Sequence, residues 1–319
     1  MGQHEGLRIG VVGLGSMGLG MAVSLLRAGF KVKGCDVDPK AVQAFGAAGG
    51  QAAASPAQVA YNADIVVVVV VNAPQTETVL FGPDGAAAAM KEGAVVISSA
   101  TMAPDAARML AAQAAERGLL YIDAPISGGA LKAAAGDLTM MASGSPDAFA
   151  RARPALDAMA GKVYELGSEA GIGAAFKIVN QLLAGVHIAA ACEAVTFAKR
   201  LGLNLDKVYE VITASAGNSW MFENRVPHIL DDDYTPKSAV NIFTKDLGIL
   251  SDMARAESFP TPLAASALQM FLMTAASGMG RDDDASVARL YAKIAGVDLG
   301  GGKASANVDN SAPHEAAPR

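Results

Sequence analysis

Apolar runs alternate with Ala-rich amphipathic segments through the first half of the chain. The apolar runs are LRIGVVGL, KVKGCDV, ADIVVVVVVNA, GAVVISSA, LYIDAPIS, LTMMASG and KVYEL. Segments with helical spacing lie between them and include residues 17–28, 39–48, 56–61 and 104–117. Strand–helix alternation at this spacing predicts an α/β fold, a doubly wound parallel sheet with helices on both faces. The last two runs are predicted to close the sheet in mixed orientation.

The pattern changes after Gly167, where strand-like runs end. Residues 171–201 read as one long apolar helix without an internal proline, and further helices are predicted over 206–216, 240–256 and 262–278. We therefore predict a Rossmann-type domain over residues 1–167. An all-helical domain for substrate binding and oligomerisation would follow over 168–300, beginning with a long interdomain helix. The small, polar stretch 301–319 is predicted to be a disordered tail.

Composition narrows the class of protein. The 319 residues are 52% hydrophobic and 18% charged, which is typical of a soluble protein with a large core. The net charge of −6 and the absence of a basic cluster argue against a nucleic-acid partner. We find no signal-peptide pattern, and the run IVVVVVV is too short to span a bilayer. We therefore expect a soluble, cytoplasmic protein without a membrane partner.

The cysteines and histidines suggest neither a disulfide nor a metal site. Cys35 and Cys192 lie far apart without C-x-x-C spacing, so both thiols are expected to be free in a reducing compartment. The four histidines form no ligand spacing, and no metal is predicted. Two Asp triplets, 231–233 and 282–284, lack the Gly and Glu spacing of a calcium loop and are interpreted as solvated loops.

A glycine motif follows the first predicted strand and opens a helix, as a dinucleotide-binding fingerprint requires. Gly13 would form the tight turn, Gly15 would let the backbone approach a pyrophosphate, and Gly18 would allow close helix packing. The phosphates would then lie at the positive end of the helix. The predicted cofactor loop comprises Gly13, Leu14, Gly15, Ser16, Met17 and Gly18.

An acidic residue, Asp36, ends the second predicted strand about twenty residues beyond the motif. A carboxylate there accepts hydrogen bonds from a ribose 2′-hydroxyl and repels a 2′-phosphate, which favours NAD over NADP. The alternative interpretation is a plain glycine turn with a solvated Asp36.

A lysine interrupts the long apolar helix. Lys177 and Asn180 stand three residues apart in GIGAAFKIVNQLLA and share one helical face. A buried ammonium is costly unless it is paired. Either Lys177 extends its head to the surface, or it lies in an interdomain cleft with a chemical task.

Four motifs, taken together and in order, resemble the β-hydroxyacid dehydrogenase family. They are IGVVGLGSMGLGMA, DAPISGG, GIGAAFKIVNQ and KDLGIL. The resemblance covers nearly the whole chain and implies hydride transfer between NAD and a small hydroxy acid. Members of the family are commonly dimers or tetramers, so a homodimer or homotetramer is expected.

The resemblance also implies roles for individual residues. Lys177 would be the general acid/base, with a pKa lowered by burial and by the cationic nicotinamide, and Asn180 would orient it or hold a substrate oxygen. Gln181 stands where many members have a second asparagine. The remaining candidates are Ser127, Gly128 and Gly129 for the substrate carboxylate, Thr101 beside the nicotinamide ribose, and Lys245 over the cofactor and substrate. Lys245 has the alternative reading of a solvated helix lysine.

Residues 217–247 further resemble those members that oxidise the 2-hydroxyl of the four-carbon sugar acid L-threonate with NAD. A 3-hydroxyisobutyrate dehydrogenase, or a reductase of tartronate or succinic semialdehyde, is the alternative enzyme. An inactive dinucleotide-binding scaffold is the alternative of another class, and the retained Lys177 speaks against it.

Several residues keep two interpretations. His187 lies near the helical line of Asn180 and contacts either a substrate hydroxyl or the core. Residues 220–222, Trp-Met-Phe, line either a pocket or an aromatic core. Arg225 is a candidate for a second carboxylate contact.

Overall fold

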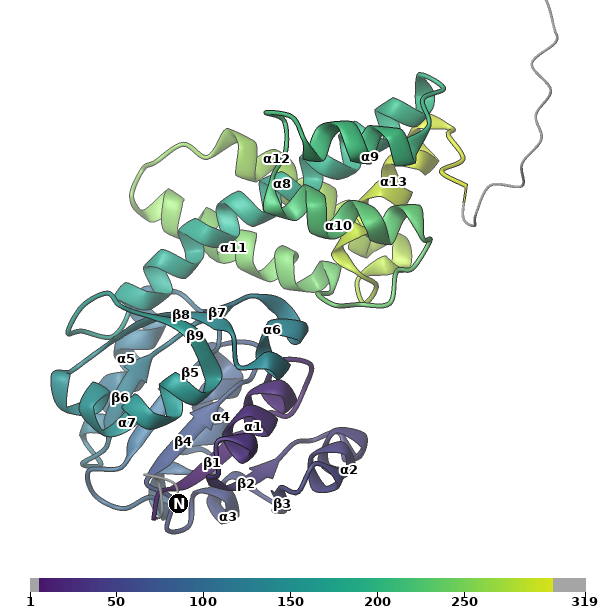
Figure 1. Ribbon diagram of the computed structural model, residues 1–319. Coiled ribbons are helices and arrows are strands. Elements are labelled where there is room, and N and C mark those ends of the chain that lie inside the picture. Colours follow the sequence, from purple (N-terminus) through teal and green to yellow (C-terminus); the bar gives the residue numbers. More distant parts are fainter. Residues whose placement is uncertain (1–5, 301–319) are drawn as a thin grey trace, which may run out of the picture.

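A sheet of nine strands forms the centre of the N-terminal half of the computed structural model, which describes residues 6–300 (Figure 1). The strands are β1 (Arg8–Val12), β2 (Lys31–Cys35), β3 (Gln51–Ala52), β4 (Ile65–Val68), β5 (Val95–Ser98), β6 (Leu120–Asp123), β7 (Ile126–Ser127), β8 (Leu138–Gly144) and β9 (Ala160–Glu165). Their order is β3-β2-β1-β4-β5-β6-β8-β7, with β9 beside β8. Strands β1 to β6 pair in parallel. Because β8 is antiparallel to β6 and β7, the predicted mixed closure is confirmed.

Helices cover both faces of this sheet, so the predicted doubly wound α/β fold is confirmed. They are α1 (Gly18–Arg27), α2 (Pro39–Ala47), α3 (Pro56–Ala60), α4 (Ala73–Phe81), α5 (Pro104–Ala115), α6 (Gly129–Ala135) and α7 (Pro146–Met159), with a 3₁₀ turn η1 (Ala87–Ala89). Several have proline at the first or second position, after a capping side chain that accepts from a first-turn amide, as Ser55, Asn72 and Ser145 do.

The chain winds in opposite directions from β1, through β2 and β3 on one side and β4 to β6 on the other. Ligands of open parallel sheets bind in the crevice at such a switch point, outside the carboxyl ends of the strands. The glycine loop follows β1 at this position, and the loop after β4 lies next to it, since the Val69 amide donates to the Val12 carbonyl. The fold therefore places the predicted cofactor loop at the ligand-binding edge.

The second half of the described chain is helical. Its elements are α8 (Ile172–Arg200), α9 (Leu205–Thr213), α10 (Trp220–Leu230), α11 (Val240–Ala256), α12 (Pro262–Thr274), η2 (Ala275–Met279), η3 (Asp284–Ser286) and α13 (Val287–Ala295). The predicted long helix is α8, which α10, α11, α12 and α13 surround to form one core. Two of these helices, α10 and α13, were not predicted. The predicted tail, 301–319, lies outside the described residues.

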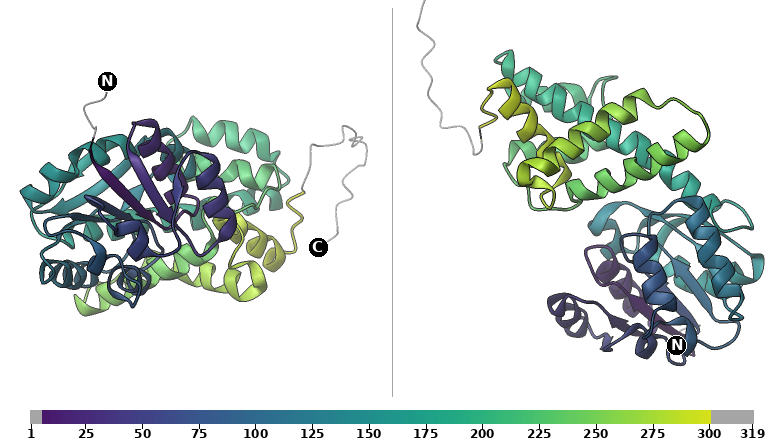
Figure 2. Two further views of the ribbon diagram at one scale, coloured as in Figure 1. Left: turned by 90° about the horizontal axis from the view of Figure 1, so that it is seen from below. Right: turned by 180° about the vertical axis from the view of Figure 1, so that it is seen from behind.

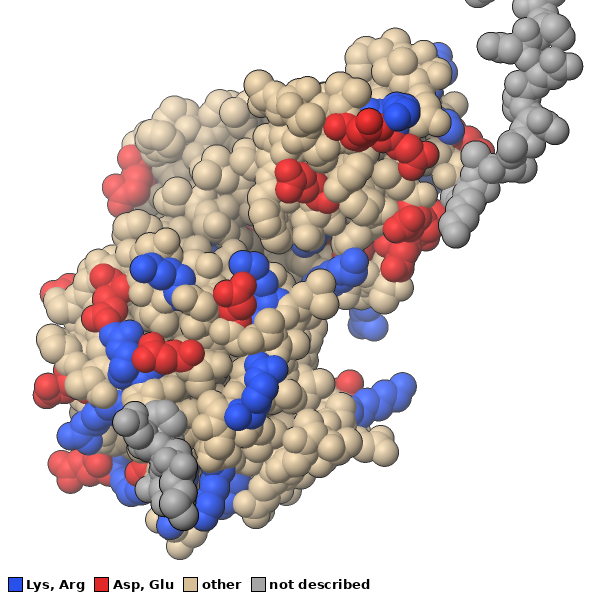
Figure 3. Space-filling model, viewed as in Figure 1, with Lys and Arg blue, Asp and Glu red and all other residues tan. Residues whose placement is uncertain are grey.

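Helix α8 also joins the two halves, since its first turns pack on β8, β6 and α5 while the rest runs through the helical domain (Figure 2). By length and hydropathy it is the one helix within residues 6–300 that would suffice to cross a membrane. Half of its most apolar window is buried inside the protein, as in the core helix of a soluble domain. On the face shown in Figure 3, acidic and basic side chains are intermixed without a continuous basic patch.

Candidate active site

The glycine loop has the geometry that a dinucleotide requires. Gly13 has a φ of +94°, and a Cβ there would lie 2.4 Å from the Val69 carbonyl oxygen. At Gly18 a Cβ would lie 1.9 Å from the Gly13 carbonyl oxygen, so both positions need glycine for the strand, loop and helix to pack. Nothing lies within 4 Å of a Cβ at Gly15, and no side chain caps α1. Backbone amides at the helix start are therefore open to an anion.

Asp36 is held beside this loop. Its carboxylate accepts hydrogen bonds from the Leu14 amide at 2.5 Å and the Asp38 amide at 2.8 Å. A carboxylate has about four acceptor positions, so capacity remains for hydroxyl donors. The loop and the acidic strand end thus form one continuous surface at the carboxyl edge of the sheet.

The start of α8 is anchored by Asp123, a residue that our sequence reasoning missed as a functional contributor. Asp123 ends β6, is fully buried, and accepts hydrogen bonds from the amides of Gly171 at 3.0 Å and Ala174 at 2.8 Å. Burial raises the pKa of Asp123 to about 6, although both amide bonds lower it. At Gly173 a Cβ would lie 2.3 Å from the Met141 carbonyl oxygen. The acidic residue of DAPISGG and a glycine of GIGAAFK therefore fix the helix on the sheet.

Lys177 follows one turn later and does not reach the surface. Only 7% of the residue is exposed, which rules out the alternative of a head group extended into solvent. Burial lowers the pKa of Lys177 to about 8; the charge of Lys245 lowers it too, and Asp246 opposes both. Within residues 6–300 the ammonium has no hydrogen bond or ion pair. A buried amine with this pKa is suited to taking up and releasing a proton near neutral pH.

Asp246, which follows Lys245 in the chain, contacts two side chains other than Lys177. One Asp246 oxygen lies 2.7 Å from the Lys245 Nζ, and the other accepts from Gln181 Nε2 at 2.6 Å. Gln181 Oε1 in turn accepts from Asn180 Nδ2 at 3.0 Å. The residue that departs from the family pattern therefore links Asn180 to Asp246, and the Asn180 carbonyl oxygen is left for a ligand.

Lys245 reaches across to the Rossmann domain. Its Nζ donates to the carbonyl oxygens of Val71 at 2.8 Å and Thr101 at 3.1 Å. These residues follow β4 and β5, at the edge that carries the glycine loop. The solvated-lysine alternative is thus wrong, since Lys245 connects α11 to two loops of the other domain.

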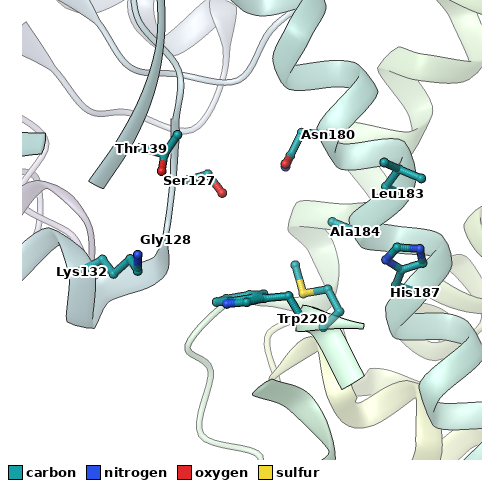
Figure 4. Close-up of a pocket in the computed structure, with 10 residues that line it drawn as sticks. Ser127, Gly128, Lys132, Thr139, Asn180, Leu183, Ala184, His187 and Trp220 are labelled. Carbon is teal, nitrogen blue, oxygen red and sulfur yellow. The ribbon is translucent and has the colours of Figure 1, made fainter. Parts of the chain in front are cut away.

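A pocket of about 280 Å³ opens between the domains (Figure 4). The Rossmann domain contributes Ser127, Gly128, Lys132 and Thr139, and the helical domain contributes Asn180, Leu183, Ala184, His187, Trp220 and Met221. Asn180 and Ser127 point into it from opposite sides (Figure 4). Gly129 begins α6 immediately behind Gly128, and Lys177 stands one turn of α8 before Asn180. The structure thus brings the DAPISGG and GIGAAFKIVNQ motifs to one cleft.

Two sequence interpretations need correction. Arg225 is not free for a substrate, because its buried guanidinium holds Asp284 through Nε at 2.5 Å and Nη2 at 3.1 Å. The second Asp triplet is not a solvated loop, since Asp283 and Asp284 are both fully buried. The nearby His228 is also buried, with its Nδ1 2.9 Å from an Asp283 oxygen. Partners more than fifty residues away in the chain explain this burial, and a charge run alone does not reveal them.

The remaining candidates divide between pocket and core. His187, Trp220 and Met221 line the pocket, whereas Phe222 is buried and stacks against Tyr209 in the helical core. Both cysteines are buried and free. Within the part of the chain that the structure describes, no three His, Cys, Asp or Glu side chains group as a metal site would require.

Two family models match successive parts of the chain. Residues 8–167 match the NAD binding domain of 6-phosphogluconate dehydrogenase. Residues 171–291 match the family described as NAD-binding of NADP-dependent 3-hydroxyisobutyrate dehydrogenase. The chain therefore belongs to the 3-hydroxyisobutyrate dehydrogenase family of NAD-dependent hydroxyacid dehydrogenases, and the predicted family is confirmed.

Individual relatives agree with this membership. The chain is 57% identical over 286 residues to L-threonate dehydrogenase of Cupriavidus necator, covering 90% of this chain and 96% of that one. It is 49% identical over 296 residues to L-threonate dehydrogenase of Escherichia coli K12, with 92% and 97% covered. Among solved structures, a 3-hydroxyisobutyrate dehydrogenase from Salmonella typhimurium has a TM-score of 0.86 at 50% identity, covering 89% of this chain and 99% of that chain.

Proposed function

We propose that this chain oxidises L-threonate at C2 with NAD, giving the 2-oxo acid, in the cytoplasm and as a homodimer or homotetramer. The observation that carries the proposal is the buried, unpaired Lys177 one turn before Asn180, where Asn180 lines a cleft that Ser127 and Gly128 close from the other domain. The L-threonate dehydrogenases at 57% and 49% identity support the substrate.

The residues at the sheet edge fit NAD. The open backbone at Gly15 and the uncapped start of α1 would hold the pyrophosphate, while Asp36 would accept the ribose hydroxyls and repel a 2′-phosphate. Thr101 follows β5 and its carbonyl oxygen accepts from Lys245 of α11, at the sheet edge where the nicotinamide half would reach. When bound, NAD would supply the hydride acceptor. The other loop residues assigned to this role are Gly13, Leu14, Ser16, Met17 and Gly18.

The substrate would be held by both domains. The Ser127 hydroxyl and the amides of Gly128 and Gly129 would bind its carboxylate. Asn180 would hold the C2 hydroxyl, and the neutral Lys177 amine would take the hydroxyl proton while the C2–H electron pair leaves as hydride. The O–H pair then forms the carbonyl bond. In the reverse direction the ammonium of Lys177 returns the proton.

Two alternative functions are compared with this one. The family name and the Salmonella typhimurium structure favour 3-hydroxyisobutyrate as the alternative substrate. An inactive scaffold is disfavoured, because a buried, unpaired ammonium is energetically costly and a scaffold would gain nothing from it.

Oligomerisation is supported by the outer face of α8. Phe176, Val179 and Phe197 recur on this helix at near-helical spacing, and each is more than half exposed. Such an apolar stripe on a soluble protein is typical of a subunit contact. Light scattering of the purified protein would give the number of subunits.

The test is NADH formation with L-threonate, D-erythronate, 3-hydroxyisobutyrate and D-glycerate, each with NAD and NADP. We expect turnover with L-threonate and NAD. Turnover confined to 3-hydroxyisobutyrate would replace the substrate, and a preference for NADP would contradict the role of Asp36. NAD binding without turnover of any acid would favour the scaffold.

A further inference from the structure

The far end of the pocket carries one polar side chain on an otherwise apolar wall. His187 lies two turns beyond Asn180 on α8, on the same face. Its neighbours there are Leu183, Ala184, Trp220 and Met221 (Figure 4). Asn180 lies on the same helix, and the polar lining side chains Ser127, Lys132 and Thr139 stand across the pocket on the Rossmann domain. The His187 ring is thus separated from the groups assigned to the carboxylate.

The position of His187 matches the direction in which a sugar-acid chain would extend. The helical rise separates the Cα atoms of Asn180 and His187 by about 10 Å. With the carboxylate at Ser127 and Gly128 and C2 at Asn180, the remaining carbons of the substrate run along α8 towards His187. The stretch 217–247, which resembles the threonate-oxidising members, enters the pocket here through Trp220 and Met221.

We infer that His187 hydrogen-bonds to the terminal C4 hydroxyl of the substrate and selects for it; this inference rests on the proposed function. An imidazole has a donor or acceptor available in either tautomer, and a hydroxyl serves as both. The surrounding wall is apolar, so an acid that lacks the hydroxyl leaves His187 without a partner. Sites built to bind a hydroxyl discriminate against analogues without it for this reason. 3-Hydroxyisobutyrate, which has a methyl branch and no hydroxyl other than the one that reacts, would be disfavoured.

A double cycle of enzyme and substrate tests this contact. kcat/KM is measured for L-threonate and for 4-deoxy-L-threonate, with the wild type and with His187→Leu. Removing either partner is expected to lower kcat/KM about tenfold, corresponding to about 1.4 kcal/mol, and removing both is expected to cost no more than removing one. His187→Gln, which keeps hydrogen-bonding groups, should retain most of the wild-type preference. KM for NAD should stay unchanged in both variants.

Two outcomes would overturn the inference. Equal losses for the two acids in His187→Leu are additive in the cycle and would show that His187 acts structurally and does not contact the C4 hydroxyl. An unchanged kcat/KM for L-threonate would show that His187 contributes nothing. Wild-type protein that fails to oxidise L-threonate would instead contradict the proposed function and, with it, the substrate on which the contact depends.

Discussion

The helical domain buries two groups of charged side chains, and they differ in one respect. At one, Arg225 holds Asp284 with two hydrogen bonds, and His228 pairs with Asp283. Asp283 accepts further bonds from the amides of Lys237 and Ala285. At the other, Asp246 is occupied by Lys245 and Gln181, and Lys177 is left without a partner among residues 6–300.

The two groups show what pairing does to a buried cation. Burial lowers the Arg225 pKa, but the charge and hydrogen bonds of Asp284, together with the charge of Asp283, raise it above its ordinary value. The Lys177 pKa is lowered to about 8, because burial outweighs the attraction of Asp246. The paired cation stays charged and joins α10 to η3, whereas the unpaired one changes its protonation near neutral pH. Both cations are buried, so pairing with a carboxylate, more than burial, determines which of the two keeps its charge near neutral pH.

The largest effect is expected for turnover after loss of Lys177. Lys177→Ala should lower kcat about 10²- to 10⁴-fold, the range that a positioned general base contributes. NAD affinity should remain within about twofold, because the cofactor residues lie at the sheet edge. Steady-state kinetics and titration of NAD by fluorescence measure both quantities.

The matched control is Lys199→Ala, a lysine near the other end of α8. Its kcat should equal that of the wild type. Near-normal turnover of Lys177→Ala would show that the unpaired lysine has no chemical role. Lys177 would then not differ in function from the paired Arg225.

The paired group should respond in stability instead. Arg225→Leu leaves the fully buried Asp284 unpaired, and removing one member of a buried pair costs about 3–5 kcal/mol. Urea unfolding should show this loss, while the double variant Arg225→Met with Asp284→Leu should recover most of it. A single variant as stable as the wild type would contradict the structural role.

A smaller effect, of opposite sign, is expected for the stability of Lys177→Met. The folded pKa of about 8 lies below the ordinary lysine value of 10.5, so a buried ammonium destabilises the wild type below pH 8. At about 1.4 kcal/mol per pKa unit, the substitution should stabilise the protein by up to about 3 kcal/mol at neutral pH. The gain should fade as pH rises from about 8 to 10.5, where both states of the wild type lose the proton. Destabilisation at pH 7 would show that Lys177 is paired after all.

Most of the Rossmann domain could be predicted from local sequence patterns. The strand, the glycine turn and the following helix are neighbours in the chain, so the requirement for glycine at Gly13 and Gly18 could be inferred from their order. The two-residue strand β3 was missed because it has no periodicity of its own. The role of Asp123 was missed because its partners, Gly171 and Ala174, come about fifty residues later.

The helical domain was harder to predict for the same reason. The polar character of Asp283 and Asp284 suggests solvent, and only their contacts with α10 and the segment before α11 explain the burial. Helix α10 was missed although Ser219 caps it, since Pro227 interrupts its pattern. The sequence left His187 between pocket and core, and only the packing of α8 against α10 decides this.

The most direct test of the unpaired lysine is the pH dependence of kcat/KM for L-threonate oxidation. Lys177 must be neutral to accept the proton, so the rate should rise with pH and reach a plateau above about pH 8. The reverse reduction, which needs the ammonium, should fall above the same pH. Oxidation that stays flat through this range, or a profile that Lys177→Arg leaves unchanged, would contradict the assignment of Lys177 as the base.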